Sequence, residues 1–404
     1  MTAFSFDVDV AIIGGGIGGL WLLNRLRTRG LNAVLLEKNA LGSEQSVNSQ
    51  GMIHGGIKYA LGGSLTGASE AIAAMPDHWR RCLRDEGDVD LRGAQVLSDH
   101  FYLWSTETLT SRLAAFFGSK MTRGRVESVA PRERHPAFQN PAFRGNLYRL
   151  VDMVLDVPSV VQKLADNCAG RIYKIEALNF VRGGIGNEND GDVTAIQFQQ
   201  MSGDTIEIRP RQIVLSAGAG NETLLQQLDC SKPVMQRRPL QQVLLKHDYP
   251  HALYAHCTGS NPSPRLTISS HPTCDGKWVW YLGGDLATSN ADLNADALIA
   301  KAKQELRDLL PWLPFDNAQW ATVCIDRAEP KQKGLIKPDK AFAAATDRCT
   351  NVIAAWPTKL TLAPNMADAV EALLDLQPRA AALPAACASL AAPVVATPCW
   401  DTLF

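Results

Sequence analysis

Three glycines and one acid near the N-terminus are the residues whose types and spacing point most clearly to chemistry. Gly14, Gly16 and Gly19 form the pattern G-x-G-x-x-G, and Glu37 ends the next apolar run. Glycines at this spacing allow a tight turn, a close approach to a pyrophosphate and close packing of a helix on a sheet. The acid is placed to bind both hydroxyls of an adenosine ribose, and it disfavours a 2′-phosphate. The pattern predicts that residues 8–38 bind FAD or NAD.

The segments around these residues have the periodicity that such a site needs. Residues 8–13 and 32–36 are short apolar runs typical of buried strands, and Leu20, Leu23 and Leu26 recur between them at helical spacing. A helix that begins at the glycine turn offers unpaired N–H groups and partial positive charge to phosphates. Strand, helix, strand and acid together predict a complete βαβ dinucleotide-binding unit.

Size and composition exclude several classes of protein. A chain of 404 residues can bury roughly three quarters of its unfolded surface, enough for two domains. With 40 basic and 41 acidic residues the net charge is −1, so we expect no nucleic acid as a partner. The nine cysteines show no C-x-x-C pair and no metal-ligand spacing. They predict reduced thiols, no metal site and a cytoplasmic protein.

The two ends of the chain carry weaker signals. The N-terminus has no signal-peptide pattern, and no segment is long and apolar enough to cross a bilayer. Residues 380–397 are rich in alanine and are interrupted by Pro384 and Pro393. We predict that this stretch is weakly structured and lies over the surface, and that residues 381–404 form an alanine- and proline-rich C-terminal tail. Peripheral association with a membrane stays open.

Nucleotide-domain patterns return twice after the N-terminal unit. Residues 155–164 predict a helix, and residues 212–216 predict a buried strand that leads into a second glycine turn. Another buried strand at 351–355 precedes a helix at 364–376. These patterns predict a discontinuous nucleotide-binding domain at 1–90, 150–222 and 328–380.

The segments between these parts have a different period. Alternating strands at 242–247, 265–270 and 277–282 suit an antiparallel sheet with one covered face, and a charged helix at 296–310 interrupts them. We predict a second, substrate-binding domain at 91–149 and 223–327.

This interleaving resembles the FAD-dependent oxidoreductases of the D-amino-acid-oxidase-like superfamily. The segment NSQGMIHGGIKY at 48–59, with GSL at 63–65, is most similar to L-2-hydroxyglutarate dehydrogenases and FAD-linked glycerol-3-phosphate dehydrogenases. SAGA at 216–219 resembles the second glycine turn of the family, and KLT at 359–361 resembles the segment that precedes its last helix. The resemblance implies an α/β fold (α+β overall), with a Rossmann-like FAD-binding domain interleaved with a mainly antiparallel β-sheet substrate domain.

The resemblance also implies which residues bind FAD. They are Gly14, Gly16, Ile17, Gly18, Gly19, Glu37, Lys38, Ser49, Gln50, Gly51, His54, Gly55, Gly56, Ala217, Gly218, Thr358, Lys359, Leu360 and Thr361. Two features depart from the family pattern. Pro357 and Thr358 replace two glycines before Lys359, and Ala328 replaces the proline that usually follows the arginine at 327.

In such a family FAD accepts a hydride at its N5 atom, and the protein removes a proton from the substrate. His54 is the candidate base, because an unperturbed imidazole has a pKa near working pH. The alternatives are that His54 only hydrogen-bonds the flavin or is covalently attached to it. Arg327 and Lys359 are candidates to bind a carboxylate or phosphate of the substrate.

The function that follows is an FAD-dependent dehydrogenase or oxidase that acts on a small anionic substrate. That substrate would be a 2-hydroxy acid, a glycerol-phosphate-like alcohol or an amino acid, and the electron acceptor, oxygen or a quinone, stays open. The alternatives are an amino-acid or amine oxidase that uses oxygen, and a catalytically altered flavoprotein that acts as a binding component. An NAD-dependent dehydrogenase is disfavoured, since the segment at 54–56 has a flavin-facing counterpart in the family.

Overall fold

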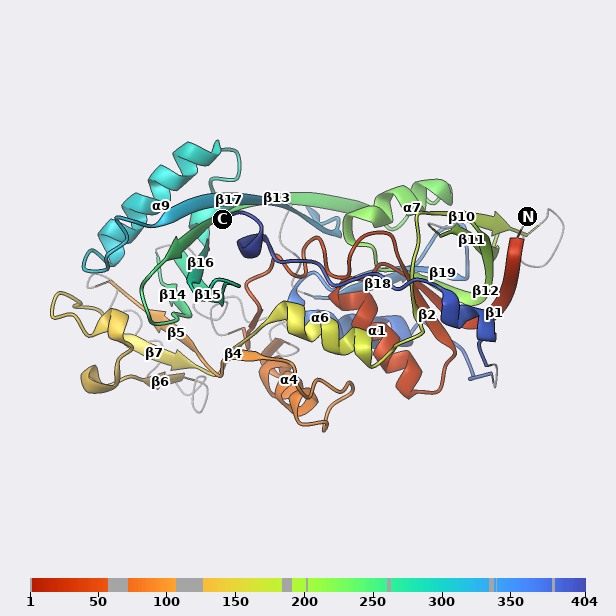
Figure 1. Ribbon diagram of the computed structural model, residues 1–404, viewed down its shortest axis with the longest axis horizontal. Helices are drawn as coiled ribbons and strands as arrows, with labels where there is room; N and C mark the ends of the chain where they lie inside the picture. The colour runs from red at the N-terminus through yellow and green to blue at the C-terminus, as the bar shows by residue number, and fades with distance from the viewer. Residues whose placement is uncertain are drawn as a thin grey trace.

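The predicted βαβ unit forms the middle of an eight-stranded sheet (Figure 1). β1 (Thr2–Ile13) and β2 (Ala33–Glu37) are parallel neighbours, and α1 (Ile17–Thr28) connects them. β12 (Thr205–Leu215) lies on the other side of β1, also in parallel. The computed structural model describes residues 2–56, 72–106, 126–183, 191–200, 203–259, 263–333, 338, 340–379 and 382–404. The predicted flavin-facing residues 57–59 and 63–65 lie outside these ranges.

The rest of this first sheet comes from parts of the chain that are far apart in sequence. Its order is β10-β11-β12-β1-β2-β9, and β19 pairs with both β12 and β18. The bounds are β9 (Ile172–Lys174), β10 (Ala177–Arg182), β11 (Val193–Gln199), β18 (Phe342–Ala345) and β19 (Val352–Trp356). The strand predicted at 212–216 is the end of a longer strand, β12. Strands from residues 2–13, 172–182, 193–215 and 342–356, as far as the structure describes them, thus share one sheet, although the predicted domain boundaries themselves stay a prediction.

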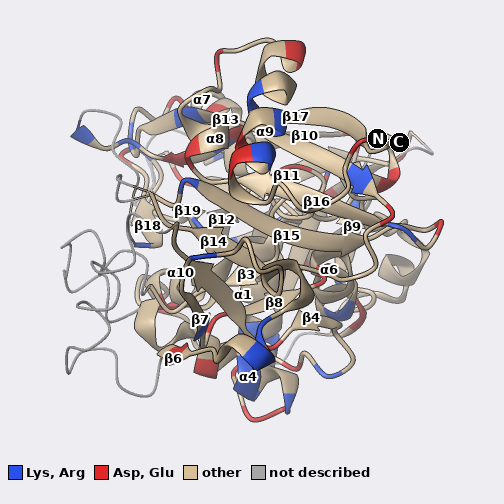
Figure 2. Ribbon diagram, turned by 90° about the vertical axis from the view of Figure 1, so that its left-hand side faces the viewer, with Lys and Arg blue, Asp and Glu red and all other residues tan. Residues whose placement is uncertain are grey.

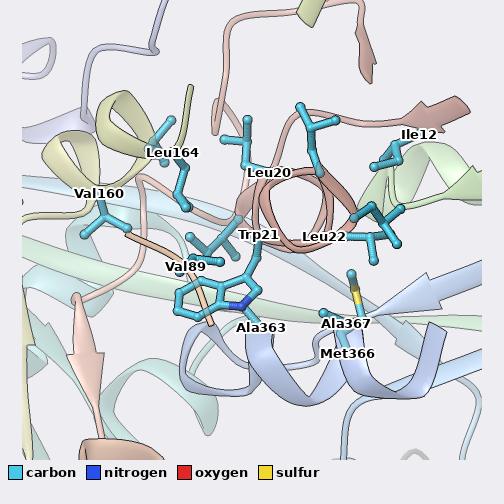
Figure 3. Packing of buried hydrophobic residues seen from close by; sticks show 14 of the residues in the cluster. Ile12, Leu20, Trp21, Leu22, Val89, Val160, Leu164, Ala363, Met366 and Ala367 are labelled. Carbon is cyan, nitrogen blue, oxygen red and sulfur yellow. The ribbon is translucent and has the colours of Figure 1, made fainter. Parts of the chain in front are cut away.

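Helix α1 is buried because it packs on three sides. Every residue from Ile17 to Leu26 is buried, as expected for a helix that is apolar around most of its surface. α6 (Val157–Asp166) and α10 (Ala363–Glu371) flank it, and Trp21 packs beside Val89 and Ala363 (Figure 3). Helix α10 ends at Glu371, earlier than the predicted end at residue 376.

A second sheet of eight strands forms the other part of the molecule (Figure 1). Along its order the strands are β17 (Gln319–Pro330), β13 (Met235–His247), β16 (Trp278–Gly283), β15 (Leu266–Pro272), β14 (Ala255–Cys257), β5 (Phe101–Trp104), β7 (Leu147–Leu150) and β6 (Val126–Ser128). β14 and β5 are parallel, and all other neighbours in this order are antiparallel. This agrees with the alternating pattern of the sequence.

The second sheet has two different faces. Val243, Leu245 and Trp280 lie on the face that packs against α9 (Ala295–Leu309). On the opposite face, Leu244 and Tyr281 pack against the C-terminal end of the chain. A small third sheet has the order β3 (Met52–Ile53), β8 (Met153–Leu155) and β4 (Val96–Ser98). Further helices among the described residues are α4 (Met75–Leu83), α7 (Asn221–Gln227) and α8 (Asp285–Thr288).

Residues 382–397 carry little regular structure beyond a short 3-10 helix at Ala385–Ser389, and most of them are exposed. This stretch runs from the first sheet to the second (Figure 1), and Leu41 pairs with Val395 on the way. The last residues differ, because Cys399 and Trp400 are buried against Leu244 and Tyr281 of the second sheet. Alanine and proline content describes local propensity and did not indicate this aromatic anchor, which gains its stability from distant strands.

In Figure 2 the ribbon segments of basic and acidic residues are interspersed along the chain, in keeping with the net charge of −1. None of the helices in the part of the chain that the structure describes could cross a membrane.

One buried charged group connects α1 with its neighbours. The Asp88 carboxylate accepts hydrogen bonds from Trp21 Nε1 at 3.0 Å, Arg25 at 2.6 Å and Cys82 Sγ at 3.2 Å, and His78 Nε2 lies 2.6 Å away. Burial alone would raise the pKa of Asp88, but the interactions with His78, Trp21 and Arg25 outweigh it and hold that pKa below its usual range. The ionised carboxylate is therefore part of the folded state.

We expect the Asp88→Asn variant to lose about 2–3 kcal/mol of unfolding free energy near neutral pH, because Arg25 loses a buried partner. The lowered pKa means that this stabilisation is complete above the unfolded pKa of about 4 and is lost as the pH falls towards the folded pKa. Urea unfolding at pH 6 and pH 3 should therefore show a smaller difference between variant and wild type at pH 3. Asp77→Asn, at an exposed position of α4, is the control. An equal deficit at both pH values would contradict this account.

Candidate functional site

A cavity of about 820 Å³ lies where the two large sheets meet. That volume is within the usual range of small-molecule and cofactor sites. Its walls come from the glycine turn after β1, the end of β2, residues 42–50, the second glycine turn, and the segment after β19. Residues of β13 and β17 close it from the second sheet.

The glycine turn is built by backbones that approach more closely than side chains would permit. Gly14 has φ +116°, and a Cβ there would lie 2.5 Å from Ser216 O. At Gly19 a Cβ would lie 2.0 Å from Gly14 O, so the helix could not pack on the turn. At Gly16 the nearest atom to a Cβ would be Ser46 Oγ at 3.4 Å, and this residue lines the cavity. Gly14 and Gly19 therefore serve the fold, whereas Gly16 leaves space in the cavity.

The N-terminus of α1 opens on this cavity. Its N-cap, Gly16, has no side chain to bond the first N–H groups, but the Ser46 hydroxyl accepts a hydrogen bond from Ile17 N at 3.0 Å. Because aligned peptide dipoles give a helix N-terminus partial positive charge, this end suits an anionic group.

Glu37 lies at the wall of the cavity, at the end of β2. Its Oε2 accepts a hydrogen bond from Gly15 N at 2.5 Å, and its Oε1 accepts one from Asn39 N at 2.6 Å. A carboxylate has about four acceptor positions, so these two bonds orient it and leave capacity for two hydroxyl donors. The side chain is half-buried.

The second glycine turn and the segment after β19 support each other. Gly218 has φ +57°, and its carbonyl accepts a hydrogen bond from Trp356 Nε1 at 3.1 Å. Thr358, which replaces a glycine of the family pattern, also has a left-handed backbone with φ +60°. A residue with a Cβ adopts this conformation at a cost of about 1–2 kcal/mol. The threonine thus keeps the backbone conformation that glycine would adopt freely.

Gln50 connects the cavity to the second sheet. Its Nε2 donates to Tyr281 O at 2.9 Å and to Ser269 Oγ at 3.2 Å. A Cβ at Gly283 would lie 2.8 Å from Gln50 Oε1, so the absence of a side chain there makes room for this amide.

Cationic side chains from both sheets line the cavity. Arg237 is paired with Glu222 at 3.0 Å. Arg327, opposite Arg238 in the ladder of β13 and β17, donates from Nε to Arg238 O at 3.3 Å. Lys359 follows Thr358 in the segment from the first sheet. Arg327 and Lys359 thus reach one cavity from opposite sheets.

Most of the predicted site residues line this cavity. They are Gly14, Gly16, Ile17, Gly18, Glu37, Lys38, Ser49, Gln50, Ala217, Gly218, Arg327, Thr358, Lys359 and Leu360. Six others are not among the described residues that line it, namely Gly19, Gly51, His54, Gly55, Gly56 and Thr361. Two of these six have a structural reason for their type, because a Cβ at Gly19 or Gly51 would overlap a backbone carbonyl.

His54 is buried in the loop that follows β3. The next residue, Gly55, donates its N–H to Asp152 Oδ1 at 2.8 Å, and this bond fixes the loop to the residue before β8. The position of His54 is thus set by local hydrogen bonding, and its predicted catalytic role stays a prediction.

Sequence reasoning missed several lining residues. Ser46 caps α1, and Leu240 and Gln242 of β13 face the cavity beside Arg327. The alternation of β13 could have indicated a polar face at Gln242, but no local pattern indicates that Ser46 reaches the helix N-terminus.

Comparisons with known proteins agree with this arrangement. A family model described as FAD dependent oxidoreductase matches residues 9–373. The chain is 46% identical over 401 residues to a probable FAD-dependent oxidoreductase of Pseudomonas aeruginosa, and the match covers 99% of both. The crystal structure of an FAD dependent oxidoreductase from the same species is similar with a TM-score of 0.83 at 42% identity, again over 99% of both chains.

Two more distant structures share the fold. Glycine oxidase from Geobacillus kaustophilus has a TM-score of 0.65 at 15% identity, over 95% of this chain and 98% of that one. L-alpha-glycerophosphate oxidase from Mycoplasma pneumoniae, solved with FAD bound, has a TM-score of 0.62 at 14% identity, over 92% and 96%. The predicted fold class is confirmed.

We expect Gly16→Ala to weaken FAD binding and Gly19→Ala to lower the free energy of unfolding. The first variant keeps its stability, since its backbone is extended with φ −74° and the Cβ would meet only Ser46 Oγ, at 3.4 Å, but FAD should bind about tenfold or more weakly as the methyl group occupies the cavity. The second should lose about 2 kcal/mol or more of unfolding free energy through steric overlap. Urea unfolding and fluorescence titration with FAD measure the two quantities. Equal losses of stability would contradict this division of roles.

Proposed function

The chain belongs to the family of FAD dependent oxidoreductases, and on that premise we propose that it oxidises a small anionic substrate. We infer that the substrate is a 2-hydroxy acid or a glycerol-phosphate-like alcohol. The observation that carries the proposal is that Arg327 and Lys359, from opposite sheets, line the same cavity as the dinucleotide turn.

The residues of the cavity fit FAD. Gly16 leaves the space that a pyrophosphate needs, the N-terminus of α1 supplies N–H groups, and the half-buried Glu37 offers a carboxylate to ribose hydroxyls. Bound FAD would supply hydride acceptance at its N5 atom. The contribution of the chain is to bind the substrate, orient it and remove its proton.

Substrate binding is assigned to the cationic side of the cavity. A guanidinium can bind a carboxylate or phosphate through two parallel hydrogen bonds, and an ammonium acts as a point charge. We assign the substrate anion to Arg327 and Lys359, because they reach this cavity from the two different sheets. We assign proton removal to His54, whose local hydrogen-bonded loop would hold the imidazole in one place.

A second candidate is oxidation of an amino acid with oxygen as the acceptor. Its support is the fold shared with a glycine oxidase, and the same two cations would bind the amino acid carboxylate. We rank it second because the segment at 48–56 resembles the hydroxy-acid and glycerol-phosphate branch. The preserved backbone of Thr358 argues against a flavoprotein that has lost catalysis.

The test is anaerobic reduction of the FAD-loaded protein by a panel of L-2-hydroxy acids, glycerol 3-phosphate and amino acids. We expect one anionic class to bleach the flavin absorbance at least about tenfold faster than its uncharged analogue, such as glycerol for glycerol 3-phosphate, because a bidentate ion pair contributes a few kcal/mol. Stopped-flow absorbance measures the rate.

Arg327→Met should raise the half-saturating concentration of that substrate, whereas Arg237→Met is the matched control on the adjacent strand. Bleaching by amino acids alone would select the second candidate. No bleaching by any member of the panel would overturn the proposal.

We expect His54→Ala to slow flavin reduction about a hundredfold if the imidazole removes the substrate proton. The flavin content of the variant should stay at the wild-type value if His54 acts on the substrate proton alone. Flavin that remains with the wild-type chain after denaturation would assign a covalent link to His54 instead. An unchanged rate would remove the proposed role.

A further inference from the structure

A line of polar contacts runs from the cavity into the core of the second sheet. Gln50 Nε2 donates to Ser269 Oγ at 3.2 Å, and Ser269 Oγ lies 3.0 Å from His271 Nε2. Ser269 and His271 are both fully enclosed by protein. They lie two residues apart on β15, so their side chains share the cavity-side face of the sheet.

The Tyr281 carbonyl decides how the Gln50 amide is oriented. A carbonyl can only accept, so the amide atom that lies 2.9 Å from Tyr281 O must be the nitrogen. The hydroxyl of Ser269 is different, because it can donate or accept. The Ser269 hydroxyl accepts from the Gln50 nitrogen only if it donates its own proton to another group.

His271 supplies the place for that proton. Burial lowers the pKa of His271 to about 3, so the imidazole is neutral at physiological pH and has one bare nitrogen. With Nε2 as that nitrogen, Ser269 donates its O–H to His271 and accepts from Gln50.

The C-terminal end fixes the imidazole. The ring of Trp400 stacks on that of His271 with centroids 4.1 Å apart and planes at 24°. Trp400 itself is buried, and Cys274 N donates to Asp401 Oδ1 at 3.1 Å to hold this end in place. The C-terminal segment thus covers the far end of the polar line, on the same face of the sheet as the cavity.

We propose that His271 is a positioning residue that acts through Ser269 to hold the Gln50 amide with its oxygen available to the flavin. Both acceptors in the sheet take N–H groups of Gln50, so its amide oxygen, which lies next to Gly283, is left as the acceptor of a side chain that lines the cavity. In a flavin site, an acceptor is matched to the N–H of the pyrimidine part of the isoalloxazine ring. The inference rests on the proposed function insofar as the cavity holds FAD, and it is independent of the substrate.

The test compares two variants that keep different parts of His271. His271→Phe keeps a ring for Trp400 to stack on but removes the acceptor, whereas His271→Gln keeps a polar group within reach of Ser269. We expect the phenylalanine variant to bind FAD about 3- to 10-fold more weakly, the effect of one hydrogen bond, with a shifted visible absorption band. The glutamine variant should bind within about twofold of wild type.

His247→Phe is the matched control. His247 is also buried in this sheet, but it contacts Trp280 and Phe315 on the face that packs against α9. This variant should leave both the FAD dissociation constant and the absorption band unchanged, whatever its effect on the melting temperature.

If His271→Phe folds and binds FAD with the wild-type constant and spectrum, the inference is wrong. If all three variants change alike, His271 has only a packing role and the inference is again overturned. These readouts need no substrate, so a failed substrate panel would leave them intact.

Discussion

The structure depends on a place where three backbones come closer than any side chain would allow. The turn after β1 contacts the start of α1 at Gly19 and the second glycine turn at Ser216. A Cβ at Gly14 or Gly19 would overlap carbonyl oxygens by about an ångström, and no rotamer relieves an overlap at Cβ. This contact fixes β1, β12 and α1 relative to one another, and all other elements around the cavity are placed from them.

Because α1 is held by this close backbone contact, its burial also positions the helices that pack around it on the first sheet. A helix that is apolar on most sides must be covered on most sides, and α6 and α10 cover it together with the sheet. The few polar groups on α1 must then find partners inside the protein. Arg25 does so with Asp88 and Glu371, which ties α1 to the segment after α4 and to α10. Because α10 follows the segment with Thr358 and Lys359, the packing of α1 also places the cationic end of the cavity.

The second sheet forms one wall of the cavity because the side chains of its strands point alternately to its two faces. On β13, Val243 and Leu245 pack towards α9, whereas Leu240 and Gln242 line the cavity. The cavity-side face is polar and cationic at one end and is covered by Trp400 at the other. One sheet surface thus closes the cavity, carries Arg237 and Arg327 at its wall, and buries the end of the chain.

The sequence by itself determined the dinucleotide-binding unit, because its signals are local. Glycine spacing, apolar period and the acid at Glu37 act within one βαβ unit, and β1, α1 and β2 lie where they predict. The second glycine turn and the strands of the antiparallel sheet could be predicted for the same reason. The tertiary structure alone decided that Arg327 and Lys359 share a cavity, that Ser46 caps α1, and that Trp400 is buried against His271. These contacts join residues that are far apart in sequence, and their free energy comes from burial and hydrogen bonding that no local pattern encodes.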